Sequence, residues 1–306
     1  MNANTSGRKL YVCIPFRMNS EIQYIKLRDG MLVAYLEEGR KNKPTILFIH
    51  GLANAALVWQ WNIQFLKDHF HCIAIDLPGN GHSSRGNYPY SISFYAEVIE
   101  EVLDALHLNS VVLCGHSMGG QIAIHFTLNR PSRVQQLILM APAGFEYYTP
   151  EEAILFRSAI TLGNFLNMDE LHIAQSIQAS FFRPNTVTQT IIDELNRFIR
   201  QHNRESYRRM LDLSIASMLE NQIFDQLNQL DCAVLVFFGE EDMLIPNRFL
   251  HPIPTRKIAE NACAHIKQVQ LHTYPMTGHF VHIEQALAVN ATMLAHLKKM
   301  SATANS

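Results

Sequence analysis

Apolar residues gather in short runs along the chain, and the character of these runs changes after the first two. Eight of them predict strands, at residues 21–28, 31–38, 45–50, 70–77, 110–115, 134–141, 233–239 and 266–274. Asp29-Gly30, a dipeptide typical of hairpin turns, joins the first pair. Most later runs are continuously apolar, as in parallel strands that are covered on both faces.

Segments with helical spacing separate the later runs. They cover about residues 55–67, 91–107, 118–129 and 283–299. Alternation of strands and helices predicts right-handed crossovers and helices on both faces of a sheet. The fold class we expect is therefore α/β, doubly wound, with a mostly parallel eight-stranded sheet.

The alternation stops between residues 145 and 229, where no convincing strand occurs. Thr149 and Glu152 form a capping box, with Pro150 at the first helical position. Further helical stretches cover about residues 168–180, 186–201 and 204–220. We interpret residues 145–229 as an inserted all-helical cap and residues 1–144 and 230–306 as the core domain. A separate helical domain is disfavoured because no Pro-, Gly- or Ser-rich linker flanks the segment.

The amino-acid composition argues against several classes of protein but does not indicate a particular function. Of the 306 residues 48% are hydrophobic and 17% are charged, and the net charge is −2, so neither nucleic acid nor an anionic membrane surface is an expected partner. No apolar run reaches the ~18 residues of a membrane span. The five cysteines form no CxxC pair, which disfavours a disulfide framework or a zinc site. Residues 1–16 lack the apolar stretch of a secretion signal, so we expect a cytoplasmic protein.

The strongest chemical signal is Gly115-His116-Ser117-Met118-Gly119, which fits G-x-S-x-G between a predicted strand and a predicted helix. A serine at so tight a corner must adopt a strained backbone conformation, and glycine on either side avoids collisions. The turn would lift the Ser117 hydroxyl to the carboxyl edge of the sheet. The helix that starts at Met118 would point its amides at developing negative charge.

A serine hydroxyl needs a base, and the base needs an acid to orient it. Carboxylates follow the strand at 233–239, where Glu240, Glu241 and Asp242 are all candidates. His279 lies in a glycine-marked loop before the last predicted helix. His272 falls inside a predicted strand and His282 inside the next helix, so His279 is the favoured base.

The motifs FIHGL, DLPGNGHSS, GHSMGG, PSRVQQLIL, FFGEEDMLIP and GHFVHIEQ occur in this order along the chain. In this set and order the sequence resembles the α/β-hydrolase superfamily over nearly its whole length. The resemblance implies Ser117 as nucleophile, Asp242 as orienting acid and His279 as general base. Glu240 and Glu241 would then belong to the turn, and His116 would pack beneath the serine.

His50-Gly51-Leu52 matches the HG-x turn of the same superfamily. The resemblance implies that the backbone amides of Leu52 and Met118 form an oxyanion hole. His50 would order its loop rather than take part in the chemistry. Asp76 would likewise brace the glycine-rich turn that follows it.

The function we expect is acyl transfer to Ser117 and then to water, with a small-molecule ester or related carbonyl compound as substrate. No metal or organic cofactor is needed, and a homodimer is compatible with the sequence. One alternative is a C–C bond hydrolase of dienone acids, which would favour a cap cation. A second is a non-catalytic binding protein of the same fold. The cap cations that could serve the first alternative are Arg157, Arg183, Arg197, Arg208 and Arg209.

Apolar side chains of the cap are expected mostly to pack its helices together, with a subset lining an acyl pocket. These are Phe156, Leu162, Phe165, Leu166, Met168, Phe181, Phe182, Met210 and Met218. The stretch between Asp242 and His279 is longer than the resemblance leads one to expect. Its extra segment, NRFLHPIPTRK, is predicted to be a loop near the mouth of the site.

Overall fold

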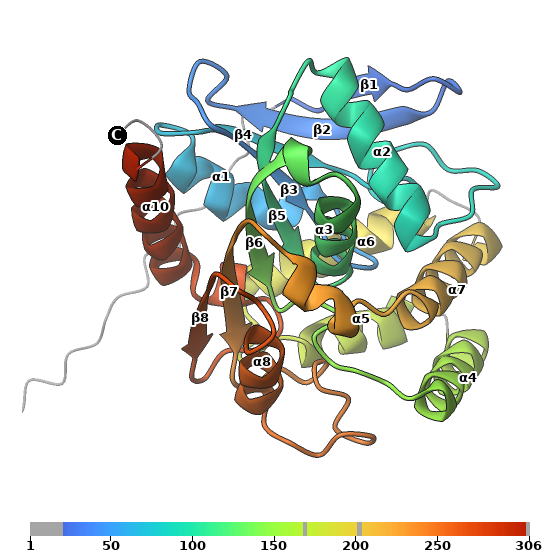
Figure 1. Cartoon of the computed structure of the whole chain (residues 1–306). Coiled ribbons are helices and arrows are strands. Elements are labelled where there is room, and N and C mark those ends of the chain that lie inside the picture. The colour runs from blue at the N-terminus through green and yellow to red at the C-terminus, as the bar shows by residue number, and fades with distance from the viewer. Residues whose placement is uncertain (1–20, 168–169, 201–203, 304–306) are drawn as a thin grey trace, which may run out of the picture.

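The computed structural model describes residues 21–167, 170–200 and 204–303, with an eight-stranded sheet at its centre (Figure 1). The strand order is β1-β2-β4-β3-β5-β6-β7-β8. β2 pairs antiparallel with β1 and β4, and every other pairing is parallel. This confirms the predicted eight-stranded, mostly parallel sheet. The strands are β1 Gln23–Lys26, β2 Leu32–Glu38, β3 Thr45–Ile49, β4 His71–Ile75, β5 Val111–His116, β6 Val134–Met140, β7 Ala233–Gly239 and β8 Val269–Tyr274.

The continuously apolar runs become the middle of the sheet. Every residue of β3, β4 and β5 is buried, because helices cover both faces. The helix α1 packs against α10, and α3 packs against α2 and against β5 and β6. The helices outside the 145–229 segment are α1 Gln60–Leu66, α2 Ile92–Ala105, α3 Met118–Asn129, α8 Thr255–Cys263, α9 Val281–Glu284 and α10 Ala286–Thr303, with short 3-10 turns η1 Ala56–Trp59 and η2 Pro131–Arg133.

Two expectations about the C-terminal part were wrong in detail. The single helix predicted at 283–299 is two helices, α9 and α10, separated at Gln285. The helix α8 was not predicted, and its first turn takes up the last three residues of the NRFLHPIPTRK segment. Pro254 sets the extended entry to this helix. Ile258 is the one bulky aliphatic residue on the buried face of α8, so its periodic signal in the sequence is weak.

Residues 145–229 contain helices and no strand within their described part. Figure 1 shows α4 and α7 side by side, and α6 contacts both α5 and α7. The chain returns to the same sheet, where β7 pairs in parallel with β6. The helical segment thus lies between two neighbouring strands, and the division into core and cap domains stays a prediction. Its elements are α4 Pro150–Asn167, α5 Glu170–Ala179, α6 Thr186–Arg200, α7 Arg204–Glu220 and the 3-10 turn η3 Phe224–Gln229.

The capping box predicted at the start of α4 is confirmed. The Thr149 amide donates to Glu152 Oε2 at 2.8 Å, and the Glu152 amide donates to Thr149 Oγ1 at 3.2 Å. The N-terminal segment 1–16 and Met168 lie outside the described residues. Within the described ranges, no helix combines the length and apolar character needed to cross a bilayer.

Candidate active site

Ser117 occupies the corner between β5 and α3, with φ 54° and ψ −120°. Few residues other than glycine adopt a positive φ, so this backbone is strained. A Cβ at Gly115 would lie against the carbonyl of Gly119, and one at Gly119 would lie against the carbonyls of Ile49 and His50. Both glycines are therefore needed to close the corner.

Asp242 and His279 are brought together by the loops that follow β7 and β8. His279 Nδ1 lies 2.7 Å from Asp242 Oδ2, and the two side chains are 3% and 0% exposed. An ionised carboxylate only accepts hydrogen bonds, so Nδ1 carries the proton and Nε2 is left with a lone pair. The amides of Leu244 and Ile245 donate to Asp242 Oδ1 at 2.8 and 3.0 Å, which fixes the carboxylate.

The loop that carries His279 is tied to the end of α5. The His279 amide donates to the carbonyl of Ser180 at 2.8 Å. Glu284 accepts from the amides of Gly278 at 2.8 Å and Phe182 at 3.0 Å. Burial raises the pKa of Glu284, and these amide hydrogen bonds act in the opposite direction. The helical segment therefore helps to place the histidine.

His50 orients the peptide between Gly51 and Leu52. Its Nε2 accepts from the Leu77 amide at 2.9 Å, so Nδ1 bears the proton and donates to the Gly51 carbonyl at 2.7 Å. In a trans peptide the N–H points opposite to the carbonyl, so the Leu52 amide is directed away from His50. Burial lowers the pKa of His50, although Asp76 acts in the opposite direction, and the ring stays neutral.

Two backbone amides lie free beside the serine. A Cβ on Gly51 would be 3.0 Å from Ser117 Cβ, so the turn that bears Leu52 touches the corner. Met118 is the first residue of α3, where an amide has no partner within its helix. In the described part of the chain, neither the Leu52 nor the Met118 amide donates to a protein group. Such amides can bind an oxyanion.

Asp76 holds the loops around this turn in place. Its Oδ1 accepts from the Ala56 amide at 2.6 Å and its Oδ2 from the His82 amide at 2.8 Å. Asp76 as a whole residue is 4% exposed. Its role in the structure is thus to connect the turn after β4 to η1.

A cavity of about 340 Å³ lies between the sheet loops and the helical segment. Ser117, Leu52 and His279 line it from one side, and α4, α5 and α7 contribute Phe156, Ile177 and Met218 from the other. The Ser117 hydroxyl makes no hydrogen bond to another described residue. Resting enzymes often show long or misaligned contacts between nucleophile and base, which tighten when substrate binds.

Glu146 contributes an acidic side chain to the cavity wall, and no lysine or arginine is among the described residues that line the cavity. The five arginines considered as substrate anchors lie elsewhere. Arg157 pairs with Glu220 at 2.7 Å and Arg197 with Glu194 at 3.0 Å. Arg183 lies 5.4 Å from the centre of the Phe182 ring, and Arg209 donates to the Tyr88 carbonyl at 3.3 Å. Arg208 is likewise not a lining residue.

The apolar residues predicted for the helical segment divide into several groups. Phe156 and Met218 line the cavity. Phe181 stacks on the lining residue Phe280 with ring centres 4.5 Å apart, and Met210 is buried. Leu162 and Phe182 are exposed. Phe165, Leu166 and Met168 lie outside the described side chains.

The other acidic candidates and His272 have different surroundings. Glu240 accepts from Thr273 Oγ1 at 2.7 Å, and Glu241 is exposed. His272 lies in β8 and stacks on Phe237 with ring centres 5.4 Å apart. None of these three residues is among the described residues that line the cavity.

Two buried histidines pack behind His279. His116 Nε2 donates to the His279 carbonyl at 3.1 Å, and burial, together with His282 and His279, holds the pKa of His116 well below its usual range. His282 packs against Trp59 with the ring planes tilted by 32°, and neither of its ring nitrogens has a partner among the described residues. Burial, with a smaller effect of His279, lowers the pKa of His282 to about 3. Both rings therefore stay uncharged at neutral pH.

Three polar residues near the site were not predicted from the sequence. Glu146 and His251 form a cluster with the start of α4, and Glu284 holds the His279 loop. Glu146 is a single acid in the apolar and aromatic stretch APAGFEYY, which is a usable signal for a buried, partnered carboxylate. His251 and Glu284 contact Glu146 and Phe182, which lie 105 and 102 positions away, and no local pattern indicates such partners. Within the described ranges no group of three or more acidic, histidine or cysteine side chains is arranged to hold a metal ion.

Comparison with curated proteins finds relatives along most of the chain. It is 28% identical over 271 residues to the dihydrolipoyllysine-residue acetyltransferase component of the acetoin cleaving system of Pseudomonas putida, covering 88% of this chain and 68% of that protein. It is 24% identical over 279 residues to monoacylglycerol lipase abhd6-B of Xenopus laevis, covering 86% of this chain and 78% of the lipase.

Solved structures share the fold. A probable hydrolytic enzyme from Pseudomonas aeruginosa PAO1 superposes with a TM-score of 0.79 at 23% identity, covering 92% of this chain and 95% of that one. An esterase from Exiguobacterium antarcticum gives a TM-score of 0.76 at 19% identity, with 90% and 99% covered. The 2-hydroxy-6-oxo-6-phenylhexa-2,4-dienoate hydrolase from Rhodococcus sp. strain RHA1 gives 0.72 at 22%, with 91% and 99% covered. The sequence profile of the alpha/beta hydrolase fold matches residues 44–286, and the chain belongs to this family of hydrolases.

Proposed function

We propose that the chain is a serine hydrolase that cleaves a carboxylic ester by acyl transfer, with residues 145–229 as its cap. Ser117 is the nucleophile, His279 the general base and Asp242 the orienting acid. The observation that carries the proposal is the 2.7 Å contact between His279 and Asp242, at a cavity that Ser117 also lines. It supports a base whose tautomer is fixed with the lone pair on Nε2.

In the first step the Ser117 oxygen attacks the ester carbonyl carbon while His279 Nε2 accepts the hydroxyl proton. Negative charge then develops on the former carbonyl oxygen, where the amides of Leu52 and Met118 stabilise it. His279 returns the proton to the alcohol oxygen, which leaves, and the acyl group remains on Ser117. Water, deprotonated by the same histidine, attacks the carbonyl carbon of this acyl-enzyme. The bond to the Ser117 oxygen then breaks, His279 returns the proton to that oxygen, and the acid is released.

The cavity wall supports an uncharged acyl group. Leu52, Phe156, Ile177, Met218 and Phe280 give it an apolar lining. The carboxylate of Glu146 would repel a negatively charged acyl group at short range. A volume of about 340 Å³ fits a small to medium acyl chain rather than a large polymer.

The same geometry is compatible with a second candidate reaction, the hydrolysis of a C–C bond in dienone acids. That substrate carries a carboxylate, for which a cationic partner in the cap would be expected. The pairing of Arg157 with Glu220 and of Arg197 with Glu194 favours the ester instead. A non-catalytic binding protein would have no need for a buried Asp242–His279 pair.

A panel of p-nitrophenyl esters of increasing acyl length, assayed beside a dienone acid, tests the proposal. We expect hydrolysis of the neutral esters by the wild type and none above background by Ser117→Ala. Ser132→Ala, at an exposed position in η2, is the matched control and should behave as the wild type. Cleavage of the dienone acid without ester hydrolysis would favour the C–C reaction, and an active Ser117→Ala would exclude Ser117 as nucleophile.

A further inference from the structure

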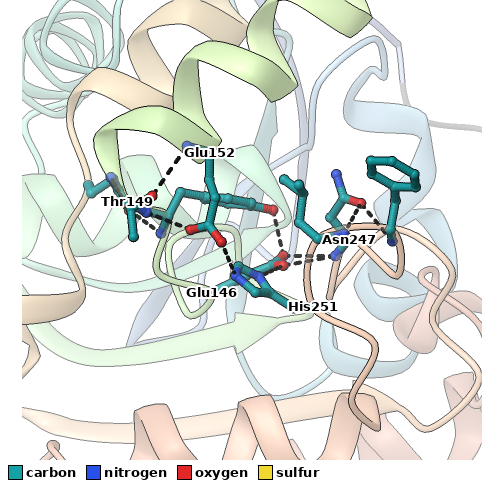
Figure 2. Close-up of polar contacts among 9 residues, drawn as sticks. Glu146, Thr149, Glu152, Asn247 and His251 are labelled. Carbon is teal, nitrogen blue, oxygen red and sulfur yellow. Dashed lines mark hydrogen bonds and ion pairs between the residues drawn. The ribbon is translucent and has the colours of Figure 1, made fainter.

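A second cluster of charged side chains lies beside the site, where the start of the helical segment meets the loop that carries Asp242. Figure 2 shows His251 between Glu146 and Glu152. His251 Nδ1 is 2.6 Å from Glu146 Oε1, and its Nε2 is 3.3 Å from Glu152 Oε1. The two ring nitrogens of His251 thus face two different carboxylates, and the imidazole bridges Glu146 and Glu152.

Glu146 is the centre of this cluster. It is 4% exposed, and its two oxygens accept from the Asn247 amide at 2.9 and 3.0 Å. Oε1 also faces His251, and Oε2 accepts from the Tyr148 hydroxyl at 2.6 Å. Burial and the Glu146 carboxylate raise the pKa of Tyr148, so this hydroxyl stays a donor. A buried carboxylate with this many donors is fully satisfied and holds its surroundings tightly.

The partners of Glu146 belong to the loop that starts at Asp242. The amide of Ile245, two positions before Asn247, donates to Asp242 Oδ1 at 3.0 Å. Arg248 Nη2, one position after Asn247, donates to the Asp242 carbonyl at 3.2 Å. The loop from 242 to 251 is thus held at one end by Asp242 and at the other by Glu146.

The bridge also reaches the helical segment. Glu152, which contacts His251, is the same residue that closes the capping box with Thr149 at the start of α4 (Figure 2). Glu146, Leu244 and Ile245 line the cavity together. The first turn of α4, the cavity wall and the Asp242 loop are therefore connected through one buried carboxylate.

We propose that Glu146 is a positioning residue for the hydrolytic reaction: through Asn247 and His251 it fixes the loop that directs Asp242 at His279. This inference rests on the proposed function of Asp242. A loop released from Glu146 would let Asp242 Oδ2 drift from His279 Nδ1, and displacements of that order are costly in catalysis. Substrate contacts would change less, so the effect should fall on kcat rather than on KM.

Glu146→Gln tests the proposal with little change of shape. An amide offers one accepting oxygen where the carboxylate offers two, so the donors from Asn247, His251 and Tyr148 can no longer all be satisfied. The matched control is Glu37→Gln. Glu37 is a glutamate of β2 whose side chain is 5% exposed, and its Oε1 lies 2.8 Å from His71 Nε2.

Three measurements are compared between these variants and the wild type. For Glu146→Gln we expect faster amide hydrogen exchange across residues 242–251, a weakened proton NMR signal from the His279 Nδ1–H bonded to Asp242, and a fall in kcat of about 10-fold or more. KM should stay close to the wild-type value. In Glu37→Gln the amide exchange across residues 242–251, the His279 proton signal, kcat and KM should all stay at their wild-type values.

Exchange across 242–251 or a His279 proton signal that stays as in the wild type would overturn the proposal, as would the same changes in Glu37→Gln. Exchange and NMR need no substrate, so they remain readable if the wild type hydrolyses no ester, a result that would count against the proposed function alone. Where esters are hydrolysed, an unchanged kcat in Glu146→Gln also overturns the proposal. If Glu146→Gln does not fold, His251→Gln at a half-buried position breaks the same bridge and is judged by the same outcomes.

Discussion

His282 should make the protein lose stability as the solution becomes acidic. The residue is 0% exposed, its ring packs against that of Trp59 with centres 4.4 Å apart, and its ring nitrogens have no hydrogen-bond partner among the described residues. A protonated imidazole there would be a buried charge without an acceptor. Burial therefore lowers the pKa of His282 from 6.5 to about 3 in the folded chain.

The sign of the effect follows from which state binds the proton. Below about pH 6.5 the unfolded chain protonates His282 and the folded chain does not, so the free energy of unfolding falls. The loss grows by about 1.4 kcal/mol per pH unit and ends near the folded pKa of about 3. At about pH 5 it amounts to about 2 kcal/mol relative to neutral pH.

His282→Phe removes the titrating group and keeps an aromatic ring against Trp59. Urea unfolding of both proteins would be followed at several pH values. The difference in free energy of unfolding between variant and wild type should shift by about 2 kcal/mol in favour of the variant between about pH 7.5 and pH 5. It should be constant above about pH 7.5, which serves as the internal control. A difference that is the same at both ends of this range would refute a buried neutral His282.

Three further outcomes follow from the site. Asp242→Asn should fold and lose kcat by about 10⁴-fold in ester assays, because the amide no longer holds the His279 tautomer. His50→Leu frees the Gly51 carbonyl and should lower kcat by about 10-fold or more through a misdirected oxyanion amide; a kcat equal to that of the wild type would contradict this. Gly119→Ala should lower the thermal midpoint sharply or prevent folding, since its Cβ would meet two backbone carbonyls.

The sheet was readable from the sequence because its middle strands are buried on both faces. A short, continuously apolar run such as the one that becomes β5 is typical of a strand covered on both faces. The prediction of eight mostly parallel strands is confirmed. The helix α8 was not readable, because its buried face consists mainly of small residues. The break at Gln285 between α9 and α10 likewise leaves no mark in the apolar spacing.

Part of the candidate site could be predicted from the sequence, because its reaction requires certain residue types at fixed positions within short motifs. Ser117, Asp242 and His279 come from such motifs, and their catalytic roles stay predictions. Glu146 and His251 could not be found in this way, because they meet only after residues 105 positions apart are folded together. Supporting contacts of this kind depend on tertiary structure rather than on local sequence.

Covalent labelling shows whether Ser117 is an activated nucleophile. A fluorophosphonate probe reacts with serines that a neighbouring base activates, and mass spectrometry of the digested protein locates the adduct. We expect stoichiometric labelling on Ser117 in the folded wild type and none in Ser117→Ala. A wild type that stays unlabelled, or a Ser117→Ala protein that labels equally well, would contradict it.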